Sequence, residues 1–188
     1  MEYHFLYVSD EKLLEKVFRF RYQIMHEEFD WISSNPMRQE TDPYDPYSVH
    51  FAVVDSQNNI CATMRLIHHS PIGYPTEKFI DPAKIEAYKE EKRCEMSRIF
   101  IARPYRNLRQ SKFFINGIVK NLAYKKMKEY GLEYCYGALE KSFLKLVNMY
   151  GIPYHPIDKA QTNYGKIRYP SLLIVKELEE KNPDITLQ

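Results

Sequence analysis

The residues best suited to chemistry lie in one segment, CEMSRIFIARPYR, at positions 94–106. Its apolar second half predicts a buried strand, and in an alternating strand Glu95 and Ser97 share one face while Arg98 points to the other. Ionised groups in a central strand must be paired or functional, because burial of a lone charge is unfavourable. This pattern favours a surface lined by a carboxylate and a hydroxyl. An edge strand with a wetted polar face is the alternative.

A second set of charged residues surrounds Arg21. This arginine falls in the apolar stripe of a predicted helix, where a guanidinium needs a partner. The loop that follows supplies three acids: Glu40, Asp42 and Asp45. Alternatively, Arg21 extends to solvent and supports the loop, and Arg65 forms a salt bridge without catalytic meaning. Trp31, the only tryptophan, either lines a pocket or belongs to the core.

The elements that position these residues predict an α+β fold. Apolar periodicity and turn signals place helices over residues 10–28, 82–91, 111–130 and 141–150. Strands are expected over residues 3–8, 49–55, 60–67, 94–102, 132–139, 154–156 and 171–175. The order of these elements indicates a single domain, residues 1–188, with a central mixed, mostly antiparallel sheet flanked by helices.

The composition excludes several classes of protein. The 188 residues carry a net charge of +2, too little for a nucleic-acid-coating protein. No apolar run approaches the roughly 20 residues of a membrane span, and no signal peptide is recognisable, so we expect a cytoplasmic protein without integral membrane contact. Cys61, Cys94 and Cys135 lack metal-ligand spacing. We expect reduced, mostly buried cysteines and no metal site.

The element order resembles the GNAT acyltransferase fold, in which a splayed sheet grips the pantetheine arm of a thioester donor. Acetyl-CoA-dependent members carry a glycine-rich turn that binds the CoA pyrophosphate at a helix N-terminus. The corresponding residues 106–111 contain no glycine. The turn region carries four basic residues, Arg103, Arg106, Arg109 and Lys112. These favour acyl carrier protein, with its phosphodiester and acidic helix, over CoA; a solvated basic turn is the alternative.

A chain of motifs extends the resemblance to one branch of this family. From the first helix to Arg106 the sequence resembles the autoinducer synthases, a branch that includes acyl-homoserine-lactone synthases, N-acyl amino acid synthases and exosortase-associated acyltransferases. The matching positions are Arg21, Met25, Trp31, Asp42, Asp45, Arg65, Glu95, Ser97 and Arg98. Met25 replaces an aromatic residue and Asp30 a glycine of the pattern. The stretches DPYD, SVHF and SPIGYP look more like the second and third groups than like lactone synthases.

The resemblance implies an enzyme that transfers a fatty acyl group from acyl carrier protein to the amine of an amino acid. Glu95 would deprotonate the amine through a water, and the strand amides at Phe100 and Ile101 would stabilise the oxyanion. Ser97 and Arg98 would position the donor and the loop. The pocket mouth would be ordered by Arg21, Asp42, Asp45 and Arg65.

The rest of the substrate site follows from the same resemblance. Met25 would shape the amine or acyl pocket, and Trp31 would cover the acyl chain in an apolar tunnel between the central strands. The donor would be acyl-phosphopantetheine on acyl carrier protein, with no permanently bound cofactor. Two alternatives remain: a homoserine-lactone synthase that uses S-adenosylmethionine, and a non-catalytic lipid or carrier-protein binding module.

Overall fold

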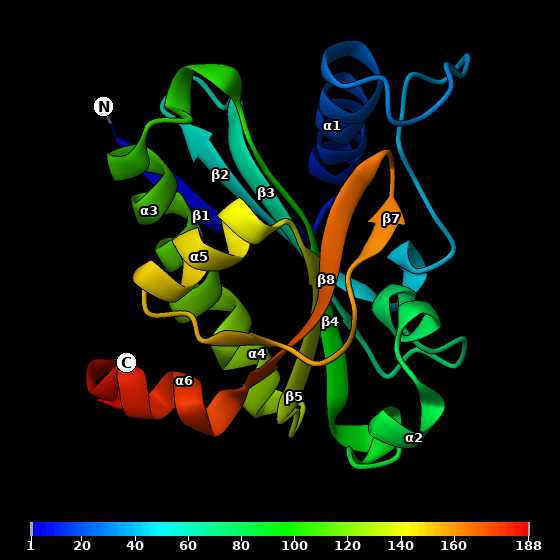
Figure 1. The fold of residues 1–188 in the computed structure, drawn as a ribbon. Helices are drawn as coiled ribbons and strands as arrows, with labels where there is room; N and C mark the ends of the chain where they lie inside the picture. The colour runs from blue at the N-terminus through cyan, green and yellow to red at the C-terminus, as the bar shows by residue number, and fades with distance from the viewer. Residues whose placement is uncertain (1, 188) are drawn as a thin grey trace.

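A computed structural model describes residues 2–187, which form a mixed sheet flanked by helices (Figure 1). The strand order is β1-β2-β3-β4-β5-β8-β6, and β7 pairs with β8. The strands are β1 (Tyr3–Tyr7), β2 (Ser48–Asp55), β3 (Ile60–His68), β4 (Arg93–Ile101), β5 (Tyr134–Leu139), β6 (Tyr154–Pro156), β7 (Gln161–Asn163) and β8 (Lys166–Ile174). All pairings are antiparallel except that of β4 with β5. The predicted fold class is confirmed.

The helices of the described chain are α1 (Glu11–Tyr22), α2 (Pro82–Ile85), α3 (Leu108–Asn116), α4 (Tyr124–Glu129), α5 (Lys141–Met149) and α6 (Val175–Lys181). A π-helical segment, Gln23–Glu28, continues α1, and another, Gly117–Ala123, joins α3 to α4. The long helices predicted over residues 10–28 and 111–130 are therefore present, with π-helical turns inside them. No helix of residues 2–187 is long and apolar enough to cross a membrane.

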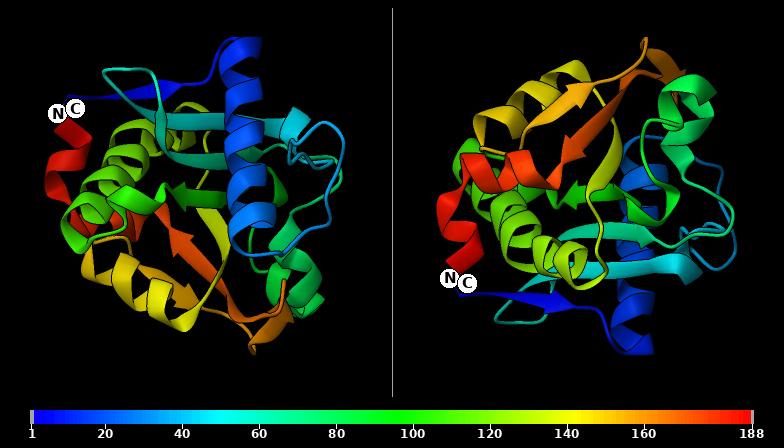
Figure 2. Two further views of the ribbon diagram at one scale, coloured as in Figure 1. Left: turned by 90° about the horizontal axis from the view of Figure 1, so that it is seen from above. Right: turned by 90° about the horizontal axis from the view of Figure 1, so that it is seen from below.

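Alternating residues of β2 explain how helices cover both faces of the sheet. Ala52 and Val54 pack with Val17 of α1, whereas Phe51 and Val53 belong to the main core beside the α3–α4 helix. Successive strand residues point to opposite faces, and β2 is buried from His50 to Val54, so each face of this strand needs its own cover. Accordingly, α1 lies in front of the strands in the view from above, and α4 and α6 lie in front of them in the view from below (Figure 2).

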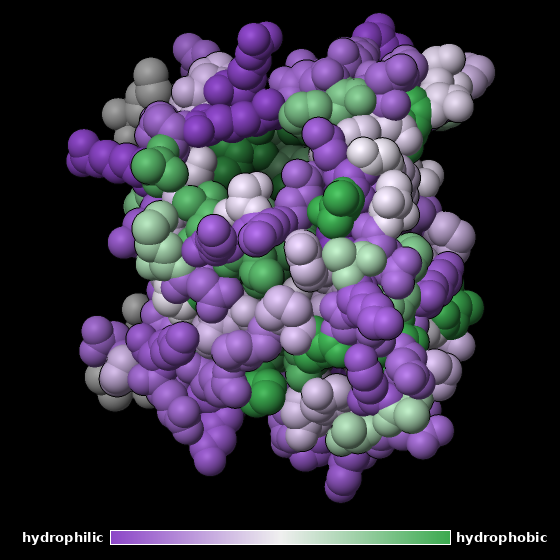
Figure 3. Space-filling model, in the orientation of Figure 1, coloured by the Kyte–Doolittle hydropathy of each residue, from purple (hydrophilic) through white to green (hydrophobic). Residues whose placement is uncertain are grey.

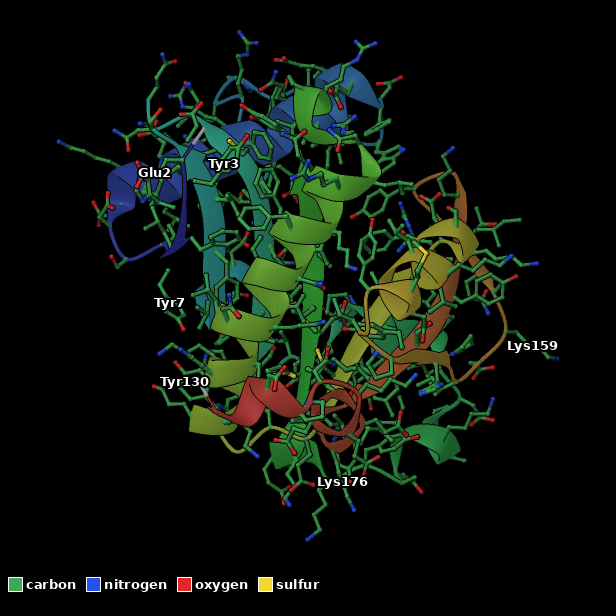
Figure 4. All side chains as sticks on the ribbon, turned by 90° about the vertical axis from the view of Figure 1, so that its left-hand side faces the viewer. Glu2, Tyr3, Tyr7, Tyr130, Lys159 and Lys176 are labelled. Atoms are coloured by element: carbon green, nitrogen blue, oxygen red, sulfur yellow. The ribbon has the colours of Figure 1, made fainter. Side chains whose placement is uncertain are left out.

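Side chains fill the layer between the sheet and the α3–α4 helix (Figure 4). The hydroxyl of Tyr7, labelled there on β1, donates to the carbonyl of Leu122 at 3.2 Å. Where Phe5 crosses the helix, the residue opposite is Gly117, and a Cβ at that position would lie 2.1 Å from the Phe5 ring. A glycine in the middle of the helix thus allows β1 to pack against it.

The central feature of the sheet is the divergence of β4 and β5. The two strands pair only where Arg93–Glu95 faces Tyr134–Tyr136. Beyond Glu95, β4 continues along β3 to Ile101, and β5 continues along β8 to Leu139. Both strands keep one partner, so their backbone groups stay satisfied on that side while a gap opens between them.

Two sequence predictions about local structure are wrong. The helix expected over residues 82–91 is only the short α2, followed by a 3₁₀ turn at Glu90–Lys92. The strand expected over 171–175 is the end of a hairpin, β7–β8, that begins ten residues earlier. Its turn consists of Tyr164 and Gly165, both with positive φ, 49° and 66°. This turn geometry suits the twist of a two-residue hairpin, and tyrosine in the first position gives no sequence signal for it.

Candidate active site

The gap between β4 and β5 opens into a cavity of about 630 Å³, here called the splay cavity. This volume lies within the range of roughly 300–1,000 Å³ typical of small-molecule sites. Its apolar lining includes Met25, Trp31, Ile99, Ile115, Phe143 and Leu146, and its polar lining includes Glu95, Ser97 and Arg98. Figure 3 shows a hollow with apolar residues at its floor in the upper half of the molecule. The structure thus brings most of the predicted site residues to one cavity.

Glu95 lies on β4 at the last residue paired with β5 and is only 3% exposed. Its Oε2 accepts a hydrogen bond from the backbone N–H of Thr76 at 2.8 Å. Burial raises the pKa of Glu95 to about 7, although this hydrogen bond and the charges of Arg65 and Arg98 favour the ionised form. A carboxylate with a pKa near 7 beside an apolar cavity is suited to accept a proton from an amine.

Three arginines and three acids form a closed ring of alternating charge beside this cavity. Arg21 donates to Glu40 and Asp45, Arg65 to Asp45 and Asp42, and Arg98 to Asp42 and Glu40. Each residue of this charged ring therefore contacts two of opposite sign.

The distances in the charged ring are those of strong ion pairs. Arg21 Nη1 is 2.8 Å from Asp45 Oδ1, and Arg65 Nη1 is 2.6 Å from Asp42 Oδ1 and 2.7 Å from Asp45 Oδ1. Arg98 Nη2 is 2.7 Å from Glu40 Oε1 and 2.9 Å from Asp42 Oδ2. Because formal charges cancel within the ring, Arg21 and Arg65 tolerate complete burial.

Electrostatics hold two acids of the ring, Asp42 and Asp45, ionised. Burial by itself would raise the pKa of Asp45, but Arg21 and Arg65 outweigh it and lower the pKa to about 2. The pKa of Asp42 is also lowered, because Arg65 and Arg98 overcome the effect of burial. His50 lies behind the ring, 3.6 Å from Asp45. Burial lowers its pKa to about 4, so it is neutral at pH 7.

A bulge in β4 decides where Arg98 points. The register with β3 shifts between Thr63 and Arg65, and Arg98 adopts a φ of 54°. Ser97 Oγ accepts a hydrogen bond from Arg65 Nε at 3.1 Å. Arg65 and Arg98 both donate to Oδ2 of Asp42. The predicted alternation, with Arg98 opposite Glu95 and Ser97, is therefore wrong. The extra residue of the bulge turns both side chains toward the charged ring.

The backbone at the end of β4 presents one amide toward the gap. The backbone N–H of Ala102 donates to the carbonyl of Cys61 at 2.8 Å. These two residues lie opposite each other and are therefore a hydrogen-bonded pair of the antiparallel ladder. In an antiparallel ladder such pairs alternate, so the polar groups of Ile101 turn away from β3 and those of Phe100 turn toward it. Consistently, Arg106 Nε donates to the Ile101 carbonyl at 2.7 Å. Of the two predicted amides, Ile101 lies on the cavity side.

Aromatic side chains from two distant segments meet at the cavity. Trp31 stacks on Phe29, with ring centroids 4.7 Å apart, and on Tyr164 at the tip of the β7–β8 hairpin, 6.5 Å away. The guanidinium of Arg168 lies 5.1 Å from the Trp31 ring centroid. We call Phe29, Trp31 and Tyr164 the aromatic bridge. It joins the segment after α1 to the far wall of the cavity.

The four basic residues predicted to bind a carrier protein do not converge on one point. Arg106 lines the splay cavity and pairs with Glu28 at 2.6 Å. Arg109 and Lys112 border a groove between β1 and α3, and Arg103 borders another beside the end of α1. Asn107 caps α3, its Oδ1 accepting from the N–H of Gln110 at 3.0 Å. The turn is thus organised by side chains, without the glycines of a pyrophosphate loop.

Several residues of the site gave no sequence signal. Thr76, Lys78, Tyr164 and Arg168 all line the cavity or contact a residue that does. Their neighbours lie far away in sequence, so spacing could not reveal them. The three cysteines are free and buried as predicted. Within residues 2–187 no group of three or more possible metal ligands is present.

Comparison with known proteins agrees with this geometry. The family model for the acetyltransferase (GNAT) domain matches residues 20–116, just over half of the chain. The chain therefore belongs to the GNAT acetyltransferase family and is an acyltransferase. A search of curated proteins gave no match.

Three similar solved structures share the fold over nearly the whole chain. The structure of TofI with an inhibitor and MTA is 16% identical, with a TM-score of 0.75, and the match covers 98% of this chain and 100% of that one. The CoA-dependent acyl-homoserine lactone synthase BjaI, with SAM and isopentyl-CoA, is 18% identical (TM-score 0.74; 98% and 89% covered). FeeM, an N-acyl amino acid synthase from uncultured soil microbes, is 13% identical (0.63; 100% and 98%). The fold is thus shared with the autoinducer-synthase branch that the motifs indicate.

Proposed function

We propose that this protein is an N-acyl amino acid synthase, which transfers a long-chain fatty acyl group from acyl carrier protein to the amine of an amino acid. One observation carries the proposal: a buried carboxylate, Glu95, lies where β4 leaves β5 and faces an apolar cavity of about 630 Å³. The cavity supplies room for a fatty chain, and the carboxylate supplies a base beside it.

The reaction needs one proton transfer and one exchange of bonds. The amine loses a proton to Glu95, directly or through a water, and its nitrogen forms a bond to the thioester carbonyl carbon. The carbon–sulfur bond then breaks, and the pantetheine thiolate leaves and takes up a proton. The Ile101 amide supports the attack of the amine, as a donor to the oxyanion that develops on the carbonyl oxygen.

Support for acyl carrier protein as the donor comes from the start of α3. Exposed basic residues, Arg109 and Lys112, lie here beside the exposed side chains of Leu108 and Phe113. A basic surface with apolar anchors suits an acidic helix better than it suits a nucleotide. A glycine-free turn gives the CoA pyrophosphate few open amides.

The alternative donor and acceptor follow from the similar structures. BjaI is described as CoA-dependent and was solved with SAM, so a lactone synthase that uses S-adenosylmethionine is the second candidate. The two activities differ in product. The first releases an N-acyl amino acid, and the second releases an acyl-homoserine lactone.

The test combines both donors with both kinds of acceptor. The purified protein is incubated with C12 to C18 chains on acyl carrier protein or on CoA, together with amino acids or S-adenosylmethionine, and the products are identified by mass spectrometry. We expect acylated amino acids, formed faster from the carrier protein. Lactone release with S-adenosylmethionine alone would reverse the ranking. No product in any combination would favour a non-catalytic binding module.

A further inference from the structure

Four cationic side chains line the splay cavity within the described part of the chain: Lys78, Arg98, Arg106 and Arg168. Arg98 is held by Glu40 and Asp42 of the charged ring, and Arg106 by Glu28. Arg168 donates to the carbonyl of Asn163 at 2.7 Å and contacts the aromatic bridge. These three guanidiniums are therefore already engaged by protein groups.

Lys78 differs from the other three cations. Among residues 2–187 no carboxylate lies within 4.0 Å of its Nζ, which lies 5.4 Å from the centroid of the Tyr44 ring. The side chain is exposed at the cavity edge. The hydroxyl of Tyr44 raises the pKa of Lys78, with a smaller contribution from the carboxylates of Asp42 and Glu95. The ammonium group is therefore charged at neutral pH and open to a new anionic partner.

The fold places this ammonium group beside the candidate base. Lys78 and Thr76 belong to the same 3₁₀ turn, Pro75–Phe79, and the N–H of Thr76 is bound to Glu95 Oε2 at 2.8 Å. The turn is itself fixed, because Glu77 pairs with Arg93 of β4 at 2.7 Å and accepts from the N–H of Tyr74. The cation therefore lies on a short, anchored turn, and the candidate base is hydrogen-bonded to the same turn.

This arrangement matches a substrate that carries an amine and a carboxylate on the same carbon atom. We propose that Lys78 binds the carboxylate of the acceptor while Glu95 receives the proton of its amine, so that the enzyme selects α-amino acids over simple amines. The inference rests on the proposed function and adds the group that distinguishes the acceptor.

The experiment compares acceptors that differ only in the carboxylate, such as tyrosine with tyramine and phenylalanine with phenethylamine. Wild-type protein is expected to prefer the amino acid. In Lys78→Met the KM for the amino acid rises about 10- to 100-fold, as expected for loss of a charge-assisted hydrogen bond. The KM for the amine and for the acyl donor stays unchanged. Lys78→Arg restores most of the preference because it keeps the charge.

A matched control is Lys176→Met, since Lys176 lies on α6 and points outward, away from the cavity (Figure 4). This variant is expected to behave as wild type. Equal use of amino acid and amine by the wild-type protein overturns the inference but leaves the proposed acylation of amino acids intact. An equal increase in KM for the amino acid and the amine in Lys78→Met would have the same two consequences. Failure to acylate any amine defeats the proposed function and this inference together.

Discussion

Oε2 of Glu95 and the backbone N–H of Thr76 are 2.8 Å apart, and this hydrogen bond joins the center of the sheet to the irregular segment between β3 and β4. The bond lies at the point where β4 and β5 diverge. It holds one carboxylate oxygen in place and leaves the other available to a substrate or a water. The orientation of the candidate base is therefore set by a backbone group, which side-chain substitutions at position 76 do not remove.

Glu95→Gln is expected to reduce kcat about 10²- to 10⁴-fold, because the variant keeps the shape of the site but lacks the base. Acyl carrier protein binding should stay near normal. Steady-state kinetics measure the first effect and a binding titration the second. Unchanged turnover would exclude Glu95 as the base.

The pH dependence of the reaction should report the same group. The carboxylate must be ionised to accept a proton, and burial raises its pKa to about 7. Below pH 7 the rate should therefore fall about tenfold per pH unit, and above it the rate should level off. The fall in rate below pH 7 should be absent from the residual activity of Glu95→Gln. A wild-type rate that is constant between pH 5 and 8 would contradict the assignment.

Glu95 should also reduce stability at alkaline pH. Its folded-state pKa of about 7 lies above the ordinary glutamate value of 4.5, so the folded state binds this proton more tightly than the unfolded state. The resulting stabilisation is present below about pH 4.5 and is lost as the pH rises through 7. At pH 8 Glu95→Gln should be more stable than wild type by up to about 3 kcal/mol, and at pH 4 nearly equal. Urea unfolding at both pH values measures the difference.

The charged ring should be much more sensitive to truncation than surface ion pairs. Arg65→Met leaves Asp42 and Asp45 without one of their two arginines in a buried site, and it should lower the free energy of unfolding by about 3–5 kcal/mol. Arg19→Met serves as the control, since Arg19 pairs with Glu15 on the surface of α1. Its effect should stay below about 1 kcal/mol. Similar losses in the two variants would mean that the ring contributes no more than an exposed pair.

The aromatic bridge should control use of the acyl donor. Tyr164→Ala removes the partner of Trp31 at the hairpin tip and opens that side of the cavity. We expect a higher KM for long-chain donors, a smaller change for short ones, and an unchanged KM for the acceptor. Tyr164→Phe keeps the ring and should retain wild-type kinetics. An equal effect of both variants on all chain lengths would argue against a contact with the chain.

Local sequence features predicted much of the fold. Apolar periodicity located α1, the α3–α4 helix and the central strands, because each of these elements buries one face or both. The same logic failed for α2, whose residues are mostly exposed. It also failed for β7, whose three residues form one arm of a hairpin and are mostly exposed.

The sequence alone identified the residue types of the charged ring and of the candidate base. A carboxylate, a hydroxyl and an arginine in the strand at positions 94–106, and an arginine on an apolar helix face near three acids, required partners because unpaired buried charges are unfavourable. Only the tertiary structure decided how they meet. The closed ring depends on the bulge that turns Arg98, and the raised pKa of Glu95 depends on burial by segments distant in sequence. Both depend on strand pairing: the bulge lies in the pairing of β4 with β3, and Glu95 lies where the pairing of β4 with β5 ends.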